Sequence, residues 1–159
     1  MIRTADDFVQ MTGNENYILA GDIDLGTVSD NTNVTDGKYV VSTAKTGVVN
    51  GWSGVLEGNG YSVYNYKVTA NNAELFNLAE VHSVSIRNLN IGTSDCMVSV
   101  AVIANNASAV CGYVATGSSL NCENINIYVD LSAFWIVGGL AGFLESGTTT
   151  SFFEPRLRE

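Results

Sequence analysis

The chain has 159 residues, of which 46% are hydrophobic and 14% are charged, so length and composition predict one folded domain and exclude a disordered segment. Its formal charge of −9 argues against nucleic acid or an anionic membrane as a partner, because phosphate binding requires clustered cations. The 16 glycines and the single proline favour short strands joined by turns.

The first 13 residues predict a short amphipathic helix. Thr4–Asp7 has the form of a capping box, and apolar residues follow at roughly helical spacing as far as Met11. Gly13 can end this helix. Because the chain starts directly on a folded element, we expect any export signal to have been removed or to lie upstream.

Residues 14–61 predict the first strands and one long loop. Polar and apolar residues alternate through Gly21–Gly26, which predicts that Asp22 and Asp24 share an outer strand face. Ser29–Gly37 is rich in polar residues and predicts an exposed loop, followed by a short strand at Tyr39–Val41. Further on, Asn59-Gly60 predicts a tight turn.

A seven-residue unit then recurs. Ser85–Ile91 returns as Asn121–Ile127 and, more loosely, precedes both as Ser62–Val68. Each copy has an asparagine flanked by inward-facing apolar residues, which predicts a phase shift of the strand and an asparagine ladder along one edge. The ladder consists of Asn65, Asn88 and Asn124. The apolar columns are Val63, Ile86 and Cys122; Tyr66, Leu89 and Ile125; and Val68, Ile91 and Ile127.

A second element recurs between these units, as Leu75–Leu78, Val110–Tyr113 and Leu140–Phe143. The asparagines of the seven-residue units are 23 and 36 residues apart. Imperfect repetition at intervals of this length predicts a solenoid, here an all-β parallel β-helix with a short N-terminal capping helix. We expect a single module over residues 1–155. It divides into the capping helix (1–13), first coils with a long loop (14–61) and repeat coils (62–154), before a tail at 155–159. In the last coil Phe152 aligns with Cys122, and Glu154 replaces the ladder asparagine.

Three segments carry a family resemblance. Gly139–Gly142 resembles the GLUG motif of repetitive bacterial surface proteins, and Asn16–Leu25 and Gly54–Val68 resemble the segments that commonly precede such repeats. The resemblance covers about residues 2–152. It implies a right-handed parallel β-helix that is secreted or displayed on a bacterial cell surface, often within a larger adhesin-like or enzyme-bearing protein. The family has no general catalytic residues to transfer, and the tail after Phe152 departs from its pattern.

A few residues of the chain are candidates for catalysis or for metal binding. Asp22 and Asp24 have a spacing compatible with a carboxylate pair, but a solvated strand face is the favoured interpretation. His82, the single histidine, is favoured as a turn residue, and Asp30–Gly37 lacks the acid pattern of an EF-hand calcium loop. We therefore predict no catalytic residue, no metal site and no cofactor.

The predicted function is a non-catalytic surface module for adhesion, glycan or protein recognition, or scaffolding. The alternatives are a fragment of a carbohydrate-active β-helix enzyme of the lyase or glycosidase type, and a purely structural stalk. Arg87 and Glu123 are expected to form an exposed ion pair. The candidate recognition residues are Tyr64, Lys67, Arg87 and Asn90.

The expected partners are a glycan or a host or cell-surface protein. No membrane insertion is predicted, because the longest nearly apolar run, Ala133–Leu144, is too short to span a bilayer. A stack of strands needs covered ends, and nothing after Phe152 can act as a cap. We therefore expect a partner, a following domain or self-association at the C-terminal end.

Overall fold

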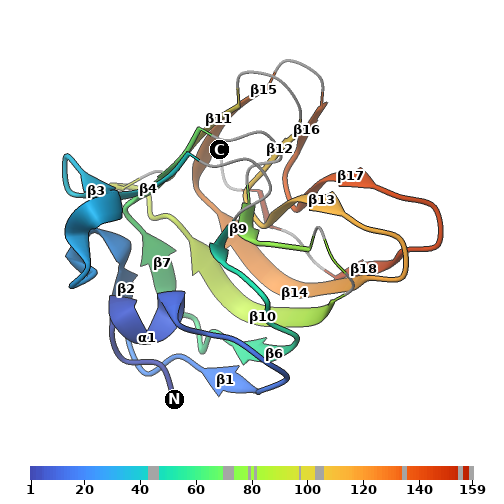
Figure 1. The fold of residues 1–159 in the computed structure, drawn as a ribbon, viewed down its shortest axis with the longest axis horizontal. Coiled ribbons are helices and arrows are strands. Elements are labelled where there is room, and N and C mark those ends of the chain that lie inside the picture. Colours follow the sequence, from blue (N-terminus) through green and yellow to red (C-terminus); the bar gives the residue numbers. More distant parts are fainter. Residues whose placement is uncertain are drawn as a thin grey trace.

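The computed structural model describes residues 1–42, 47–69, 74–78, 80, 82–96, 98–102, 106–133, 136–153 and 156–157. Short strands dominate this part of the chain, which begins with α-helix α1 (Ala5–Val9) and includes the 3-10 helices η1 (Leu25–Thr27) and η2 (Asn31–Asn33) (Figure 1). The strands are β1 (Tyr17–Ile18), β2 (Ile23–Asp24), β3 (Val34–Thr35), β4 (Lys38–Val41), β5 (Gly47–Val49), β6 (Gly54–Glu57), β7 (Ser62–Tyr64), β8 (Tyr66–Val68), β9 (Glu74–Phe76), β10 (Ser83–Ile91), β11 (Val98–Val102), β12 (Asn106–Ser108), β13 (Cys111–Val114), β14 (Ser119–Ile127), β15 (Val129–Ala133), β16 (Ile136–Gly138), β17 (Ala141–Leu144), β18 (Thr149–Phe153) and β19 (Arg156–Leu157).

Helix α1 closes the N-terminal end of the apolar interior. The capping box predicted from the sequence is present, because Thr4 accepts a hydrogen bond from the Asp7 N–H and the Asp7 carboxylate accepts one from the Thr4 N–H. Phe8 is fully buried with its ring centroid 6.0 Å from that of Phe76. Phe76 in turn packs against Trp52 at 5.5 Å, so the helix is held by an aromatic cluster.

The largest sheet curls through the molecule in the order β1-β6-β10-β14-β18 (Figure 1). Its named pairs are parallel, and β2, β7 and β19 extend it beside this path. Strands β10 and β14 form its centre, with eight register pairs that run from Ser83↔Ser119 to Ile91↔Ile127. Successive passes of the chain therefore lie side by side, as parallel pairing requires long connections.

Smaller sheets complete the described part. One has the order β15-β11-β8-β4-β3, and its last pair, β3 with β4, is antiparallel. The others are the parallel pairs β12 with β16, β13 with β17 and β5 with β9. The second recurring element of the sequence lies in β9, β13 and β17, where Cys111 pairs with Ala141 and Tyr113 with Phe143.

The repeat unit changes phase at its asparagine. Ile86 and Leu89 are both fully buried although they are three residues apart, because Asn88 between them has a left-handed backbone with φ of 53°. Asn124 makes the same change in β14 with φ of 51°. All nine residues of the three predicted apolar columns are buried, which confirms the inward faces that the pattern indicated.

The predicted right-handed parallel β-helix is wrong. The described strands form a curled half-barrel of parallel strands and several small sheets, and the three repeat units do not share one register. Between the pairs Glu57↔Arg87 and Ser62↔Asn90 the chain takes five steps on one side and three on the other, because the Asn59-Gly60 turn inserts two residues. Two parts of the prediction are confirmed: the described chain is rich in strands, and it has a short helix near the N-terminus.

This shift places Asn65 away from the other two asparagines. Val63 pairs with Ile91 and not with Ile86, so Asn65 lies at the next bend, between β7 and β8. Asn59, also left-handed with φ of 54°, lies at the bend that Asn88 occupies in the neighbouring strand. The predicted alignment of Phe152 with Cys122 is confirmed by their register, whereas Glu154 lies outside the described residues.

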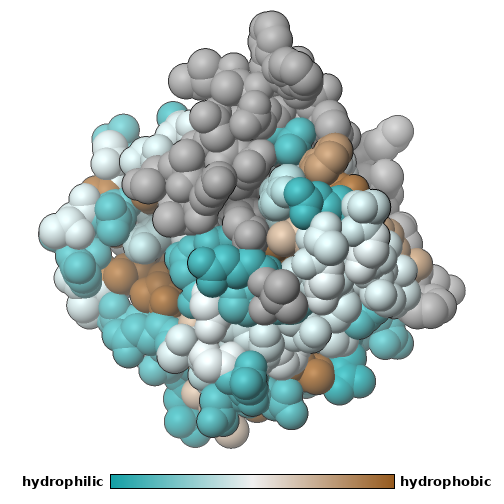
Figure 2. Space-filling view, turned by 45° about the vertical axis from the view of Figure 1, so that its right-hand side comes forward, coloured by the Kyte–Doolittle hydropathy of each residue, from teal (hydrophilic) through white to brown (hydrophobic). Residues whose placement is uncertain are grey.

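The interior is one apolar cluster whose residues range along the chain from Ile2 to Leu140. On the face drawn in Figure 2, hydrophilic residues predominate over the described surface, and apolar residues are confined to small areas. Among the described residues, no helix combines the length and hydropathy needed to cross a bilayer.

Candidate functional site

The β3–β4 hairpin builds the candidate site. Asp36 and Gly37 form its turn with φ of 52° and 70°, and two consecutive positive φ values are typical of tight hairpin turns. A Cβ added to Gly26 would meet the Gly37 carbonyl oxygen at 2.0 Å, so the hairpin packs directly on η1. This part of the predicted exposed loop is therefore a fixed strand pair.

The hairpin brings two lysines together. Strand β4 pairs in parallel with β8, and the register places Val40 beside Lys67. Lys38 lies two residues before Val40 and shares its strand face, so Lys38 and Lys67 flank the same surface. Lys38 is half-buried and Lys67 is exposed.

These lysines line a pocket of about 270 Å³, here named the lysine pocket. Its other lining residues are Thr35, Asp36, Val40 and Thr69. The lining thus offers two ammonium groups, two hydroxyls and one carboxylate. Among the described residues, neither lysine forms a salt bridge or a side-chain hydrogen bond. Both ammonium groups are therefore available for an anionic ligand.

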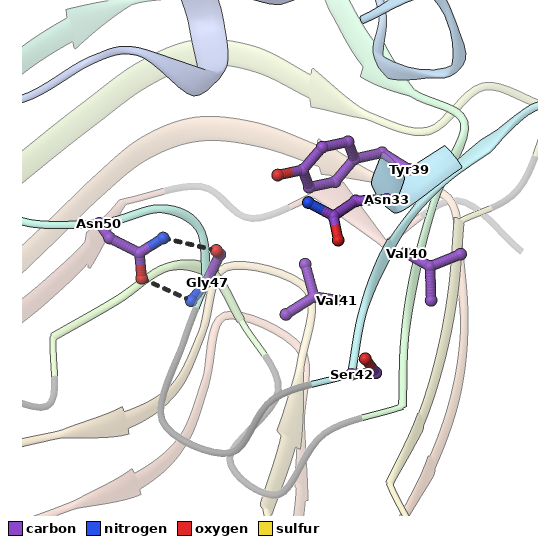
Figure 3. A pocket seen from close by; sticks show the side chains of 7 residues that line it. All are labelled: Asn33, Tyr39, Val40, Val41, Ser42, Gly47 and Asn50. Carbon is purple, nitrogen blue, oxygen red and sulfur yellow. Dashed lines mark hydrogen bonds between the residues drawn. The ribbon is translucent and has the colours of Figure 1, made fainter. Parts of the chain in front are cut away.

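A second, smaller pocket of about 150 Å³ borders the same strand. Figure 3 shows Tyr39 and Asn33 next to one another, while Val40 points away from Val41. The Asn50 amide is already bound, since it accepts from the Gly47 N–H at 2.9 Å and donates to the Gly47 carbonyl at 2.8 Å (Figure 3). The Asn50 amide of this pocket is thus already engaged by the backbone of Gly47.

Of the four candidate recognition residues, Lys67 lines the lysine pocket. Tyr64 is half-buried, and burial, followed by the charges of Asp24 and Asp22, raises its pKa. Asn90 accepts from Asn126 Nδ2 at 2.7 Å and donates to the Gly60 carbonyl at 2.6 Å. The structure therefore does not gather these four side chains into one site.

Arg87 contacts a different acid from the one expected. Its Nε lies 3.4 Å from Glu57 Oε2, with the two side chains 48% and 25% exposed. Glu123 is in register with Arg87 on the opposite side, but the described residues show no ion pair between them. Glu57 is the acid that contacts Arg87, because its carboxylate is held at the bend by hydrogen bonds from the Asn59 N–H and from Asn88 Nδ2.

Two of the three predicted ladder asparagines are in contact. Asn124 Nδ2 donates to Asn88 Oδ1 at 2.8 Å, and Asn88 Nδ2 donates to Glu57 Oε1 at 3.0 Å. Asn65 instead donates to Asp24 Oδ1 at 2.7 Å, and its own Oδ1 accepts from the Cys96 thiol. We refer to the chain of bonds from Asn124 through Asn88 to Glu57 as the amide ladder.

The remaining polar candidates have structural partners. Asp22 accepts from the Ser62 N–H at 2.8 Å, and Asp24 accepts from the Gly26 N–H at 2.9 Å. Hydrogen bonds from the Thr32 hydroxyl and N–H lower the pKa of Asp30 within its own turn. His82 Nδ1 lies 3.2 Å from Ser53 Oγ, a contact between successive strand layers.

Sequence analysis missed the lysine pocket because Ser29–Gly37 was interpreted as one loop. The signal that could have found it is Asp36-Gly37, a favoured hairpin dipeptide, between Val34-Thr35 and the strand at Tyr39–Val41. That signal would have paired β3 with β4. It would not have placed Lys38 beside Lys67, because β4 and β8 are separated by residues that no local pattern relates.

Comparison with protein families, with curated proteins and with solved structures finds no match to this chain. The resemblance to GLUG repeats therefore stays a sequence-based prediction.

Proposed function

We propose that this chain is a non-catalytic recognition module that binds a glycan bearing a carboxylate or sulfate group. The observation that carries the proposal is the lysine pocket, where two lysines without protein partners in the described part face a pocket of about 270 Å³. An acidic sugar offers an anion for the ammonium groups and hydroxyls for Thr35 and Thr69.

The lining of the lysine pocket has a net positive charge, opposite to the net charge of the whole protein. The formal net charge is −9, whereas the pocket lining carries two cations and one anion. Charges are screened beyond about 8 Å at physiological ionic strength, so the lysines dominate the interaction with a bound group. Two lysines suit one acidic sugar residue, and they are too few to bind a polyphosphate backbone.

The size of the pocket favours a sugar over a protein partner. Stable protein interfaces bury roughly 1,200–2,000 Å² of total surface, whereas a pocket of about 270 Å³ accepts a small chemical group. Location on a bacterial cell surface or in a secreted protein is part of this proposal and rests on the GLUG resemblance. Asp22 and Asp24, the residues considered for an enzyme, each bind backbone N–H groups, which supports a structural role for them.

The test is calorimetric titration with an oligogalacturonate and with its methyl-esterified form, which has the same backbone but no charge. We expect the acid to bind and the ester to bind at least tenfold more weakly. Lys38→Ala and Lys67→Ala should each weaken binding about five- to tenfold, or roughly 1–1.4 kcal/mol. Added salt should weaken it further.

Arg87→Ala is the matched control, because it removes an exposed cation outside the pocket. It should leave the affinity unchanged. Equal binding of acid and ester, or equal losses in all three variants, would contradict the proposal. Cleavage of the oligosaccharide by the purified chain would contradict its non-catalytic part, above all if Asp22→Asn or Asp24→Asn abolished the cleavage.

A further inference from the structure

Four side chains of the lysine pocket project from one face of the sheet. Thr35 is in register with Lys38 across the β3–β4 hairpin, and Val40 is in register with Lys67 on β8. Register partners share a face of a sheet, and so do residues two positions apart on one strand. This face therefore carries all four side chains. Asp36 differs from them, because it lines the pocket from the hairpin turn.

The turn fixes the position of Asp36 at the end of this face. The backbone of Asp36 is left-handed with φ of 52°, a conformation that few residues besides glycine, asparagine and aspartate adopt readily. The next residue, Gly37, is left-handed as well, and its carbonyl oxygen packs closely on Gly26. The backbone of the hairpin therefore places Asp36 in the pocket lining, two residues from Lys38.

The Asp36 carboxylate has no protein partner within the described part of the chain, where it forms neither a hydrogen bond nor a salt bridge. In contrast, Asp22 and Asp24 each accept a hydrogen bond from a backbone N–H. An ionised carboxylate only accepts hydrogen bonds, and it repels the anion of a ligand. Asp36 can therefore favour binding only where the ligand also supplies a donor, such as a hydroxyl group.

We propose that Asp36 is a specificity-determining residue of the lysine pocket, and that the ligand is a uronic acid residue with free ring hydroxyls. Lys38 and Lys67 bind its carboxylate, and Asp36 accepts a hydrogen bond from one of its hydroxyls. A uronic acid keeps every ring hydroxyl, whereas a sulfate ester at a ring position removes one of these donors. This inference rests on the proposed glycan binding and narrows it to one class of acidic sugar.

The expected contribution of Asp36 to affinity follows from its charge and its exposure. A hydrogen bond to an ionised acceptor is roughly twice as strong as one between neutral groups. Asp36 is exposed, so water competes for this bond and reduces its effect on affinity. A ligand whose hydroxyls are blocked leaves the carboxylate unpaired and should bind about fivefold more weakly.

The test is calorimetric titration of the whole chain with an oligogalacturonate and with its form acetylated at the ring hydroxyls, which keeps the carboxylates. Acetylation should weaken binding to the unmodified protein about fivefold. Asp36→Gly removes the carboxylate and adopts the left-handed turn without strain, so its affinities for the two forms should agree within about twofold. Asp36→Asn keeps the turn and a weaker, neutral acceptor, so the effect of acetylation should be intermediate.

Glu123→Gln is the matched control, because it removes one exposed acid from β14, outside the pocket lining. It should retain the full effect of acetylation. An equal effect of acetylation in Asp36→Gly would overturn the inference, because the bulk of the acetyl groups would then be the cause. Should Asp36→Gly fail to fold, an unchanged effect in Asp36→Asn would overturn it.

Failure of this inference can be told apart from failure of the proposed function. If methyl esterification weakens binding to the unmodified protein but acetylation does not, the lysine pocket binds the acid and the role of Asp36 is refuted. If the unmodified oligogalacturonate does not bind, both the proposed function and this inference are refuted.

Discussion

The amide ladder makes Asn88 the most informative position for mutation. Asn88 combines two roles, since its backbone is left-handed with φ of 53° and its side chain makes two hydrogen bonds. Alanine would lose both bonds, at about 1 kcal/mol each for a half-buried group. It would also meet a steric cost of roughly 1 kcal/mol in the left-handed region. We therefore expect Asn88→Ala to lower the free energy of unfolding by about 2–3 kcal/mol.

Asn88→Gly separates the two roles. Glycine adopts the left-handed conformation without steric cost, so this variant should lose about 1–2 kcal/mol, mainly from the missing hydrogen bonds. The difference between the two variants then measures the backbone strain. Asn14→Ala is the control, because Asn14 is exposed and makes no hydrogen bond within the described part. It should change stability by less than about 0.5 kcal/mol.

Urea titrations of the three variants, followed by circular dichroism, provide the free energies, and an unchanged slope would show that the unfolded state is comparable. If the free energy of unfolding of Asn88→Ala were within about 0.5 kcal/mol of that of the unmodified protein, the amide ladder would not contribute to stability. If the glycine variant were as unstable as the alanine variant, the contribution from backbone strain would be refuted.

Three further predictions concern the ends and the interior. Phe8→Ala should lower the free energy of unfolding by about 3–5 kcal/mol, because Phe8 is fully buried against Phe76; a loss below about 1 kcal/mol in the same titration would show that α1 is dispensable. Hydrogen bonds from the Tyr113 O–H, and others from Thr116, hold the pKa of Glu145 below its ordinary value of 4.5. The stabilisation is therefore present above that value and is lost as pH falls through the lowered pKa, so Glu145→Gln should destabilise the protein more at pH 7 than at pH 3. An effect of equal size at both pH values would exclude the carboxylate as the cause. Burial raises the pKa of the Cys122 thiol to about 12, so native protein should resist alkylation there at pH 8, and mass-spectrometric mapping that found rapid labelling would contradict this burial.

Several features of the fold could be predicted from local sequence. Thr4 and Asp7 formed the capping box they indicated, because both partners lie within one turn of chain. The apolar residues around Asn88 and Asn124 were correctly assigned to the interior, because strand alternation and a left-handed residue are properties of a few neighbouring residues. The match of Cys122 with Phe152 followed from similarity between adjacent passes of the chain.

Register between distant passes was decided by tertiary structure. The loose repeat at Ser62–Val68 suggested that Asn65 belongs beside Asn88, but two extra residues at the Asn59-Gly60 turn moved it to another bend. The arrangement of the strands as one curled sheet with several small sheets is likewise a matter of pairing between distant segments, which the repeat pattern does not specify. Residues inserted at a turn change the free energy of that turn only slightly. Their effect on the register is therefore visible only in the pairing of the strands.

The candidate site divides in the same way. The sequence by itself holds the turn signal of Asp36-Gly37, and its repeat pattern assigned Lys67 to a strand between the inward-facing residues Tyr66 and Val68. It also determined the net charge of −9, which makes two lysines in one pocket unusual for this chain. Tertiary structure alone decided that β4 pairs with β8 and that Lys67 lies beside Val40. Hydrogen bonds between strands far apart in the chain depend on the packing of the whole interior, and no local pattern encodes that choice.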